Sequence, residues 1–267
     1  MATQAKAAPH SGYDLPALRD ALAGIEILDD PVTLKRRSRD YHWFSPIAVE
    51  ALHGKIADLV VVPKSIDEVV RVASAAASLR IPITVRGSGT GTYGQAVPLH
   101  GGSVLDMSTL TAITALGPEG FTAQAGASIG EVETAARAQG LELRMHPSTK
   151  RMATIGGYFC GGSGGIGSVT WGGLREPGNL GGATVVTVEA TPQILTLEGS
   201  ETNLINRTFG STGIVVDVSA PLAPARVWHD VVLAFTNFDE APMMSRSCHR
   251  PTCFSTNRQP TAKTTQP

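Results

Sequence analysis

The chain has 267 residues, of which 42% are hydrophobic and 17% are charged, and its formal net charge is -1. This length is enough for one large domain or two small ones, and the near-neutral charge argues against a nucleic-acid or membrane-surface partner. Three cysteines are too few for a disulfide framework and favour a reducing compartment. With no secretion signal at the N-terminus and no apolar run long enough to cross a bilayer, we predict a cytoplasmic protein.

Residues 1–54 are predicted to form an irregular, partly helical leader. Helical spacing is present in DLPALRDALAG. The aromatic residues of SRDYHWFSP are expected to pack on the main body of the protein.

A β-α-β unit is predicted after the leader. ADLVVVP is a buried strand, SIDEVVRVASAAASLR is a helix and IPITVR is a second strand. Ser65 and Glu68 have the spacing of a capping box at the start of that helix. GSVLDMSTL then predicts a third strand.

A second unit follows and is richer in strands. FTAQAGA predicts a strand, and SIGEVETAARAQG predicts a helix with a capping box at Ser128 and Glu131 that ends at Gly140. ATVVTVEATPQILTLEG predicts two strands around a turn, and GIVVDVSAPLAP predicts a further strand. The resulting fold class is α+β, in two subdomains of about 55–110 and 111–224.

The C-terminal residues change in character. VWHDVVLAF predicts one more strand, so residues 225–240 are interpreted as the start of a further domain. From Ser245 onward the chain has no Val, Ile or Leu, and residues 241–267 are predicted to be a disordered tail.

A glycine motif follows the second strand. Gly89, Gly91 and Gly94 spell G-x-G-x-x-G, the fingerprint of a dinucleotide-binding turn. That turn needs a helix beginning inside the motif, whereas here Pro98 and neighbouring glycines would break one. No G-K-[ST] follows, which excludes a Walker phosphate loop. The remaining interpretations are a plain glycine-rich turn and a nest of backbone amides for an anion.

A second glycine-rich loop favours the nest. HPSTKRMATIGGYFCGGSGG has the same small hydroxyl side chains and paired glycines as the first loop. Two such loops suggest one extended ligand that lies across both of them.

Three segments in this order resemble a known family. PITVRGSGTGTYGQAVPLHGGSVLDMSTL, then HPSTKRMATIGGYFCGGSGGIGSVTWGG, then FGSTGIVVDV are similar to the FAD-binding domain of PCMH-type (vanillyl-alcohol oxidase-like) flavoproteins. The branch that it resembles contains FAD-linked oxidases near the glycolate oxidase D subunit and D-lactate dehydrogenases. The resemblance covers residues 55–224.

The resemblance implies a set of FAD-binding residues. The first loop would bind the pyrophosphate, the second would pass the flavin, and the late segment would meet the adenine through its backbone. The implied residues are Arg86, Gly87, Ser88, Gly89, Thr90, Gly91, Pro147, Ser148, Thr149, Thr154, Gly156, Gly157, Ser163, Gly164, Gly165, Gly213, Ile214 and Val215, with Gly210 beside them.

Departures from the family pattern sharpen these expectations. Thr90 stands where relatives with covalently bound flavin carry His, so the resemblance implies non-covalent FAD, and Cys160 is a less favoured attachment site. Gly167 stands where close relatives often carry Arg, and Trp171 where they usually carry Tyr. Family members usually continue into a substrate domain, so this chain is interpreted as a truncated or frame-shifted product.

The implied function is an FAD-dependent oxidoreductase acting on a small-molecule substrate, such as a 2-hydroxy acid or a similar alcohol. No catalytic residue is assigned, and His146 and Lys150 are expected to be structural or solvated. No metal site is assigned either, because Cys248, His249 and Cys253 lack a fourth ligand. Two alternatives stay open: a non-catalytic flavin-binding chain that depends on a partner subunit and, less favoured, a nicotinamide-dependent dehydrogenase.

Overall fold

The computed structural model describes residues 12–228 and 234–239. It contains two compact units, residues 1–225 and 226–267, and every helix and strand described below belongs to the first. The strand predicted in VWHDVVLAF and the predicted tail fall wholly or partly outside the described residues. Among the residues that are described, no helix has both the length and the apolar character needed to cross a membrane.

The first sheet has four strands in the order β1-β2-β4-β3. The strands β2 (Leu59–Val62), β4 (Ser103–Asp106) and β3 (Ile83–Arg86) are parallel, and β1 (Glu26–Leu28) pairs antiparallel with β2. The helix α4 (Ile66–Leu79) joins β2 to β3, which confirms the predicted β-α-β unit. The sequence patterns do not predict β1, through which the N-terminal segment joins the sheet.

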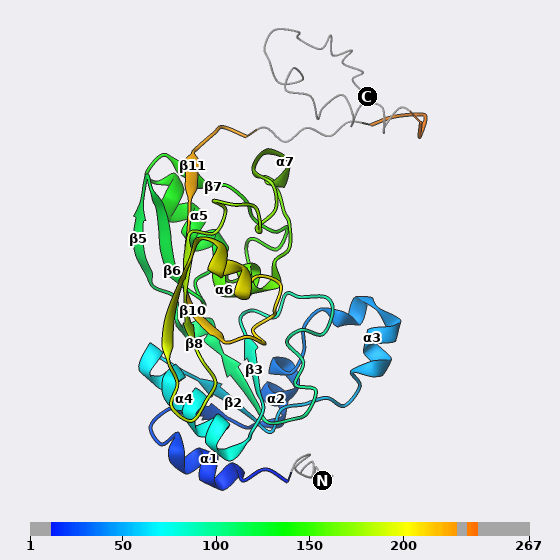
Figure 1. The fold of residues 1–267 in the computed structure, drawn as a ribbon. Helices are drawn as coiled ribbons and strands as arrows, with labels where there is room; N and C mark the ends of the chain where they lie inside the picture. The colour runs from blue at the N-terminus through cyan, green and yellow to red at the C-terminus, as the bar shows by residue number, and fades with distance from the viewer. Residues whose placement is uncertain (1–11, 229–233, 240–267) are drawn as a thin grey trace. The chain divides into compact units, whose positions relative to one another are not determined.

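The helix α4 packs against α1 (Leu15–Ala21) in Figure 1. Val69 and Val72 on α4 share a core with Leu18 on α1, and all three are fully buried. The Ser65 hydroxyl accepts a hydrogen bond from the Glu68 amide, as the cap predicted. The Glu68 carboxylate instead accepts from the amide of Lys64 at 2.6 Å.

Of the aromatic residues of the N-terminal segment, Tyr41 is half-buried and its hydroxyl donates to the Met152 Sδ at 3.8 Å, whereas Trp43 and Phe44 do not pack on the main body, so the prediction is wrong for these two. Trp43 and Phe44 are 52% and 64% exposed. Their rings stack on each other with centroids 3.9 Å apart. Both residues lie in the 3-10 turn η1 (His42–Phe44), between α2 (Pro31–Arg37) and α3 (Pro46–Ala51). In Figure 1, α3 projects away from the sheet.

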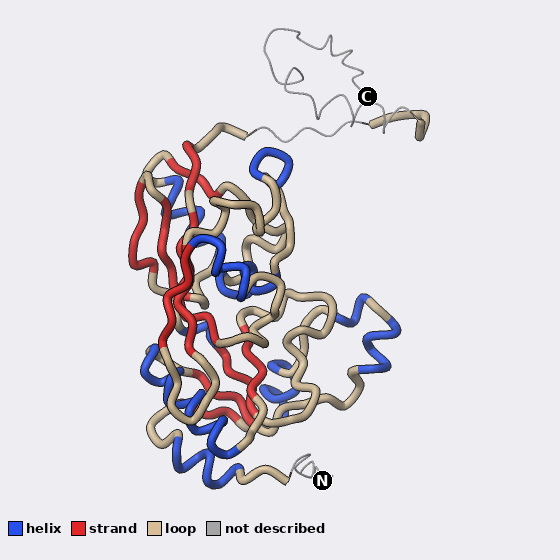
Figure 2. Tube along the Cα trace, viewed as in Figure 1, coloured by secondary structure: helices blue, strands red, loops and turns tan. Residues whose placement is uncertain are grey.

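The second sheet is antiparallel, with the order β5-β6-β10-β8-β9. Its strands form most of the red band in Figure 2. A separate two-stranded pair joins β7 (Leu141–Leu143) to β11 (Leu222–Pro224). The strands of the second sheet are β5 (Ile113–Gly117), β6 (Gly120–Gln124), β8 (Gly182–Val186), β9 (Ile194–Glu198) and β10 (Ile214–Ala220).

The segment GIVVDVSA is almost continuously apolar because both faces of β10 are covered. Val215 and Val218 face one core together with α5 (Ile129–Arg137) and α6 (Ile155–Gly161). Ile214 and Val216 face the other core, which they share with the first sheet, α1 and α4. Since a strand presents alternate residues to its two faces, a strand that is covered on both sides carries few polar residues.

The helix α5 has the predicted capping box. The Ser128 hydroxyl and the Glu131 carboxylate both accept backbone hydrogen bonds at its start. The helix ends at Arg137 with Ala138 as its C-cap, three residues before Gly140, where the end was predicted and the backbone is left-handed with φ 72°. The predicted α+β architecture is confirmed.

Candidate functional site

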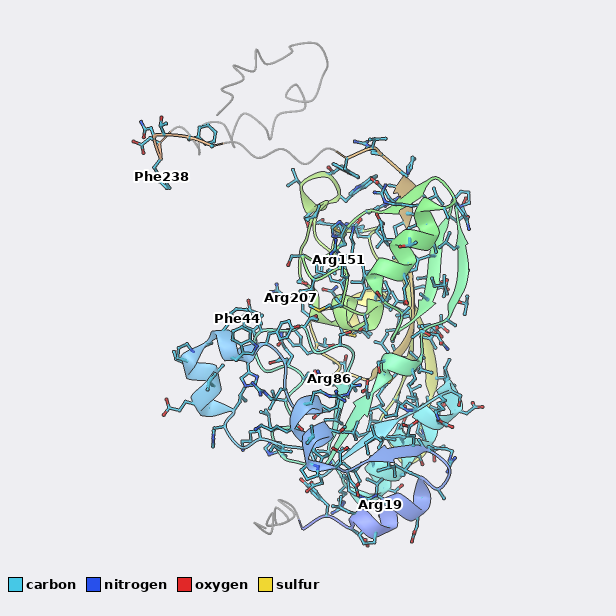
Figure 3. All side chains as sticks on the ribbon, turned by 180° about the vertical axis from the view of Figure 1, so that it is seen from behind. Arg19, Phe44, Arg86, Arg151, Arg207 and Phe238 are labelled. Carbon is cyan, nitrogen blue, oxygen red and sulfur yellow. The ribbon has the colours of Figure 1, made fainter. Side chains whose placement is uncertain are left out.

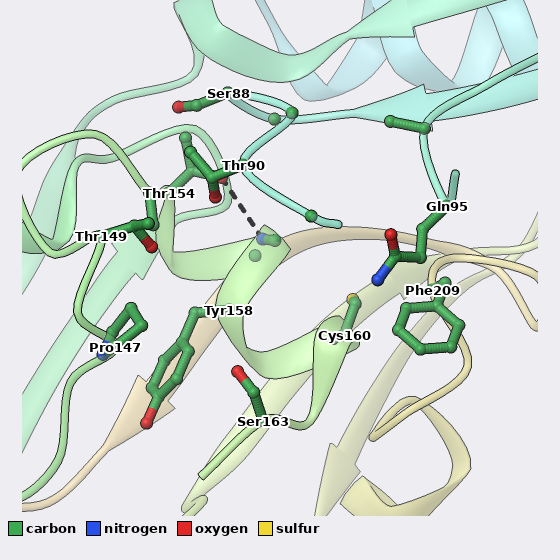
Figure 4. A pocket seen from close by; sticks show the side chains of 18 of the residues that line it. Ser88, Thr90, Gln95, Pro147, Thr149, Thr154, Tyr158, Cys160, Ser163 and Phe209 are labelled. Carbon is green, nitrogen blue, oxygen red and sulfur yellow. Dashed lines mark hydrogen bonds between the residues drawn. The ribbon is translucent and has the colours of Figure 1, made fainter. Parts of the chain in front are cut away.

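A cavity of about 840 Å³ in the first unit brings the two glycine-rich loops together. The loop after β3 reaches β4 through residues 87–102 without a helix, as the glycine analysis predicted. Figure 4 shows Ser88 and Thr90 of this loop above the cavity, with Pro147 and Thr149 on one side and Cys160 and Phe209 on the other.

The first loop presents free backbone donors to the cavity. In the described residues, the amides of Gly87 to Thr92 donate no hydrogen bond, and all of these residues line the cavity. A run of unpaired amides on a glycine loop forms an anion-binding concavity. Ser88 and Thr90 add hydroxyl donors beside it.

Arg86 supports this loop from below. Its guanidinium donates to the carbonyl oxygens of Arg39 at 2.5 Å and Ser88 at 3.2 Å, and the residue is 6% exposed. Burial, and then the charge of Arg37, lower the pKa of Arg86, while Asp106 acts in the opposite direction. The charge therefore lies under the loop, with Nη1 and Nη2 bonded to carbonyl oxygens and the buried Nε without a partner in the described part of the chain.

Two acids complete the buried charge cluster. Asp106 pairs with Arg37 at 2.9 Å between Oδ2 and Nε. Asp40 accepts from the backbone amide of His42 at 2.9 Å and lies 2.8 Å from its Nδ1. The Tyr41 amide donates to the Gly91 carbonyl oxygen at 2.7 Å, and this bond ties the segment before η1 to the loop.

The second glycine-rich stretch was expected to be a loop like the first, and this prediction is wrong. It contains the helices α6 and α7 (Ser168–Trp171). The amides of Ile155 and Gly156 donate to Ala127 and Ala125, both at 2.8 Å, so the start of α6 is already paired. Thr154 caps α6 by accepting from the Gly157 amide, the dashed line in Figure 4. The start of α6 therefore contributes cavity wall rather than free amide donors.

Most of the predicted site residues line the cavity. They are Arg86, Gly87, Ser88, Gly89, Thr90, Gly91, Pro147, Ser148, Thr149, Thr154, Gly156, Gly157, Ser163, Gly164, Gly165, Gly210 and Val215.

Gly213 and Ile214 do not line it. The Ile214 side chain is fully buried in the core shared with the first sheet. A Cβ on Gly213 would lie 2.5 Å from the Val185 Cγ1, so this glycine allows β10 to approach β8.

Several cavity residues were not predicted as binding residues, among them Tyr93, Gln95, Tyr158, Arg207 and Phe209. Nothing in the local sequence marks them, because they face the cavity only through the loop conformations. Cys160, which was interpreted as a buried small residue rather than an attachment site, is buried and also lines the cavity, and burial raises the pKa of its thiol to about 12.

His146 and Lys150 do not line the cavity. The Nζ of Lys150 lies 4.0 Å from the Glu133 Oε1, and the Nδ1 of His146 lies 3.2 Å from the Pro147 carbonyl oxygen. Among the described residues, no three His, Cys, Asp or Glu side chains are grouped to hold a metal ion. Cys248, His249 and Cys253 lie outside that part of the chain.

Residues 57–197 match the family described as FAD binding domain. The chain belongs to this FAD-binding domain family. The cavity fits the cofactor, since the unpaired amides of residues 87–92 suit a diphosphate and the volume is that of a pocket for a large ligand.

Named relatives of this FAD-binding domain extend the comparison. The chain is 30% identical to the glycolate oxidase subunit GlcD of Bacillus subtilis (strain 168), over 71% of the chain and 42% of that protein. It is 28% identical to the D-lactate dehydrogenase of Anaerostipes hadrus, over 66% of the chain and 38% of that protein. The chain thus spans less than half the length of these curated relatives.

A solved structure shares the fold. An alkyldihydroxyacetonephosphate synthase superposes with a TM-score of 0.67 and 22% identity, over 81% of this chain and 45% of that one. The predicted family and cofactor are confirmed by the family match over residues 57–197 and by the named relatives.

Proposed function

We propose that this chain is the FAD-binding part of an oxidoreductase that oxidises a 2-hydroxy acid. The observation that carries the proposal is the cavity, whose unpaired amide loop matches the family's cofactor. The substrate class is supported by the names of the two relatives, a glycolate oxidase subunit and a D-lactate dehydrogenase.

The first loop would hold the diphosphate of FAD. The amides of residues 87–92 would donate to its oxygens, with the Ser88 and Thr90 hydroxyls beside them. Arg86 would act as a positioning residue, because its guanidinium bonds the Ser88 carbonyl oxygen of the loop and the Arg39 carbonyl oxygen, and adds positive charge beneath the nest.

The second stretch would form the wall beside the rest of the cofactor. Pro147, Ser148 and Thr149 contribute one side, and Ser163 and Gly164 contribute small residues that leave room for a ring. The amides of Ser148, Thr149, Ser163 and Gly164 donate no hydrogen bond within the described residues, so each is free to donate to a ligand.

Bound FAD would supply the hydride acceptor, and the protein would supply binding and orientation. Oxidation of a hydroxy acid also needs a base or a polarising group beside the reacting hydroxyl. In the cavity wall, burial raises the pKa of Tyr158 to about 12, so this phenol is not poised as a base near neutral pH, and the Asp40 carboxylate already contacts His42. We therefore assign no catalytic residue among the described side chains.

The test is anaerobic reduction of the flavin by candidate substrates. The chain, reconstituted with FAD, is mixed with glycolate, D-lactate or L-lactate, and the flavin absorbance near 450 nm is followed. Bleaching by a 2-hydroxy acid, absent with ethanol as the control alcohol, supports the proposal. A flavin-loaded chain that no hydroxy acid bleaches would contradict it.

A second candidate is a flavin-binding subunit that acts only with a partner chain. It is favoured by the relative named as a subunit and by exposed apolar side chains such as Trp43, Phe44 and Ile47, which are 52%, 64% and 81% exposed. Dye reduction by the chain alone would argue against this candidate. Slow bleaching without turnover would support it.

A further inference from the structure

The strand β9 lies at an open edge of the second sheet. The sheet order is β5-β6-β10-β8-β9, so β9 pairs with β8 on one side, and in the described part of the chain no strand pairs with its other side. An edge strand presents unpaired backbone donors and acceptors to its surroundings. The outer side of β9 is therefore a place where a further strand can pair.

The hydrogen-bonding pattern shows which backbone groups of β9 are free. The Thr187 amide donates to the Gln193 carbonyl oxygen at 3.0 Å, at the turn between β8 and β9. Bonded and non-bonded pairs alternate along an antiparallel ladder, and the register runs without a bulge, so the odd-numbered residues of β9 bond to β8. Ile194 and Thr196 therefore direct their amides and carbonyl oxygens to the open edge.

The opposite edge of the same sheet is protected, whereas the edge at β9 is not. Natural edge strands avoid further pairing through bulges, prolines or charged side chains, especially lysine. The pairing of β5 is irregular between Ile113 and Ala115. The register of β9 has no bulge, and its sequence ILTLE has no Pro or Lys and one charge, at its last residue. Ile194 and Leu195 are 55% and 44% exposed, so the edge is also apolar.

Carboxylates lie at both ends of β9. Glu189 belongs to the turn before the strand, Glu198 ends it, and Glu201 follows in the 3-10 turn η3 (Gly199–Leu204). All three are exposed, and none forms an ion pair with another described residue. Residues 176–206 contain no Lys, Arg or His. Charge complementarity therefore favours a basic segment as the occupant of this edge.

A second copy of the chain fits the edge less well. Two β9 strands related by a two-fold axis would run antiparallel, so the turn before β9 in one copy would lie at the η3 end of the other. Glu189 of one copy would then approach Glu198 and Glu201 of the other with no cation of this segment between them. Juxtaposed like charges act against such a pairing.

We propose that the open edge of β9 binds an extended segment of a partner protein, apolar at alternate positions and carrying Lys or Arg at its ends. Its backbone would exchange hydrogen bonds with Ile194 and Thr196, and its apolar side chains would cover Ile194 and Leu195. Its basic residues would pair with Glu189 and Glu198. The proposal is independent of the cofactor and of the 2-hydroxy acid, since none of the described residues of β9 lines the cavity.

The test uses the full-length chain and a synthetic peptide with blocked ends, Lys-Val-Thr-Val-Thr-Val-Lys. The matched peptide carries Glu in place of both Lys residues. By isothermal titration calorimetry at low salt, we expect the Lys peptide to bind about 10-fold more tightly than the Glu peptide. The difference should shrink as salt is added, because the charge pairs are exposed. Equal binding of the two peptides, or no binding of either, would overturn the proposal.

Two variants address the edge itself. Thr196→Pro removes an outward amide, at the kind of position where an edge strand tolerates proline, and Ile194→Lys adds a cation to the apolar edge. Each should weaken binding of the Lys peptide about 10-fold or more. Two controls should bind as the wild type does: Ala115→Lys on the β5 edge, and Phe44→Ala, which removes an exposed ring on the part of the chain that projects away from the sheets in Figure 3.

Thermal unfolding shows whether each variant is folded. If Thr196→Pro does not fold, Ile194→Lys decides, because its side chain lies on the solvent-exposed edge. Wild-type affinity for the Lys peptide in a folded edge variant would overturn the proposal.

Amide hydrogen exchange locates the contact. In the free chain, the amides of Ile194 and Thr196 should exchange quickly and those of Leu195 and Leu197 slowly, and the Lys peptide should slow the first two. Slow exchange of Ile194 and Thr196 in a free monomer would mean that the chain covers its own edge. A dimer in sedimentation velocity that Ile194→Lys dissociates would mean that a second copy covers it. Either result would overturn the proposal.

Discussion

The guanidinium of Arg86 occupies the space that a side chain on Gly89 would need. Gly89 has a φ of 68°, so the loop passes over the arginine in a left-handed turn with nothing between them. The close approach lets Arg86 bond the Ser88 carbonyl oxygen while the neighbouring amides stay free for the cavity. Glycine is required here for both its conformation and its size.

Replacing Gly89 should therefore remove the cofactor. In Gly89→Val we expect a loss of about 1–3 kcal/mol in the free energy of unfolding from backbone strain, with a further loss from displacing Arg86, and no retained FAD. The measurements are thermal unfolding and the ratio of flavin to protein absorbance. Gly117→Ala is the control, because a Cβ there meets nothing within 4 Å. Normal flavin content in a folded Gly89→Val chain would contradict the loop assignment.

Two glycines of the same helix should respond in opposite directions. A Cβ on Gly156 would lie 2.6 Å from the Ala125 Cβ, whereas one on Gly161 would meet nothing within 4 Å. We expect Gly156→Ala to lower the free energy of unfolding of the ligand-free chain by about 1–3 kcal/mol through overpacking. Gly161→Ala should keep or raise it by up to about 1 kcal/mol, since alanine favours the helix. Equal unfolding midpoints for the two variants would argue against the close packing of α6 on β6.

The flavin should leave the protein on denaturation. Thr90 offers no ring nitrogen for attachment, and the Cys160 thiol, with its pKa raised to about 12, stays protonated near neutral pH. After acid precipitation we expect all of the yellow colour in the supernatant, for the wild type and for Cys160→Ala alike. Flavin that remains with the precipitated wild-type chain and is lost in Cys160→Ala would show a covalent link.

Asp217 should make stability depend on pH. This half-buried residue lies on β10 at an irregularity in its pairing with β8, and burial raises the pKa of its carboxyl group. As pH rises, the unfolded chain loses this proton first, so the free energy of unfolding falls between the unfolded and the raised folded pKa and stays lower above it.

Asp217→Asn should remove that loss. At pH 7 we expect the free energy of unfolding to rise by up to about 1 kcal/mol, a limit that allows for the solvent still reaching the side chain. The gain should vanish below about pH 4, near the unfolded pKa. Urea unfolding at both pH values is the measurement, with exposed Asp20→Asn as the control. A gain that does not change with pH would contradict the role of the charge.

The local elements were largely predictable from the sequence. Caps and periodicity place α4 and α5, because Ser65 and Ser128 begin helices whose apolar residues recur on one face. The prediction missed the short strands β1, β5 and β7. β1 has only three residues and is defined by its pairing with β2.

The site was predictable in part. The first loop was identified because Pro98 and the glycines after Gly94 exclude a helix, and this separates it from a dinucleotide-binding turn. The helix α6 was missed because its glycines at 156 and 157 disfavour a helix in isolation. Thr154 as N-cap and the bond from the Gly156 amide to the Ala125 carbonyl oxygen stabilise it in the folded chain.

The sequence by itself determined the fold class, the order of most elements and the segments that line the cavity, because each depends on local periodicity, caps and glycine positions. Only the tertiary structure decided which side chains face the cavity. Ile214 turns into the core while Val215 reaches the cavity wall, and left-handed turns bring Arg207 and Phe209 there as well. The direction of a side chain depends on packing between strands and helices that are distant in the sequence, which no local pattern records.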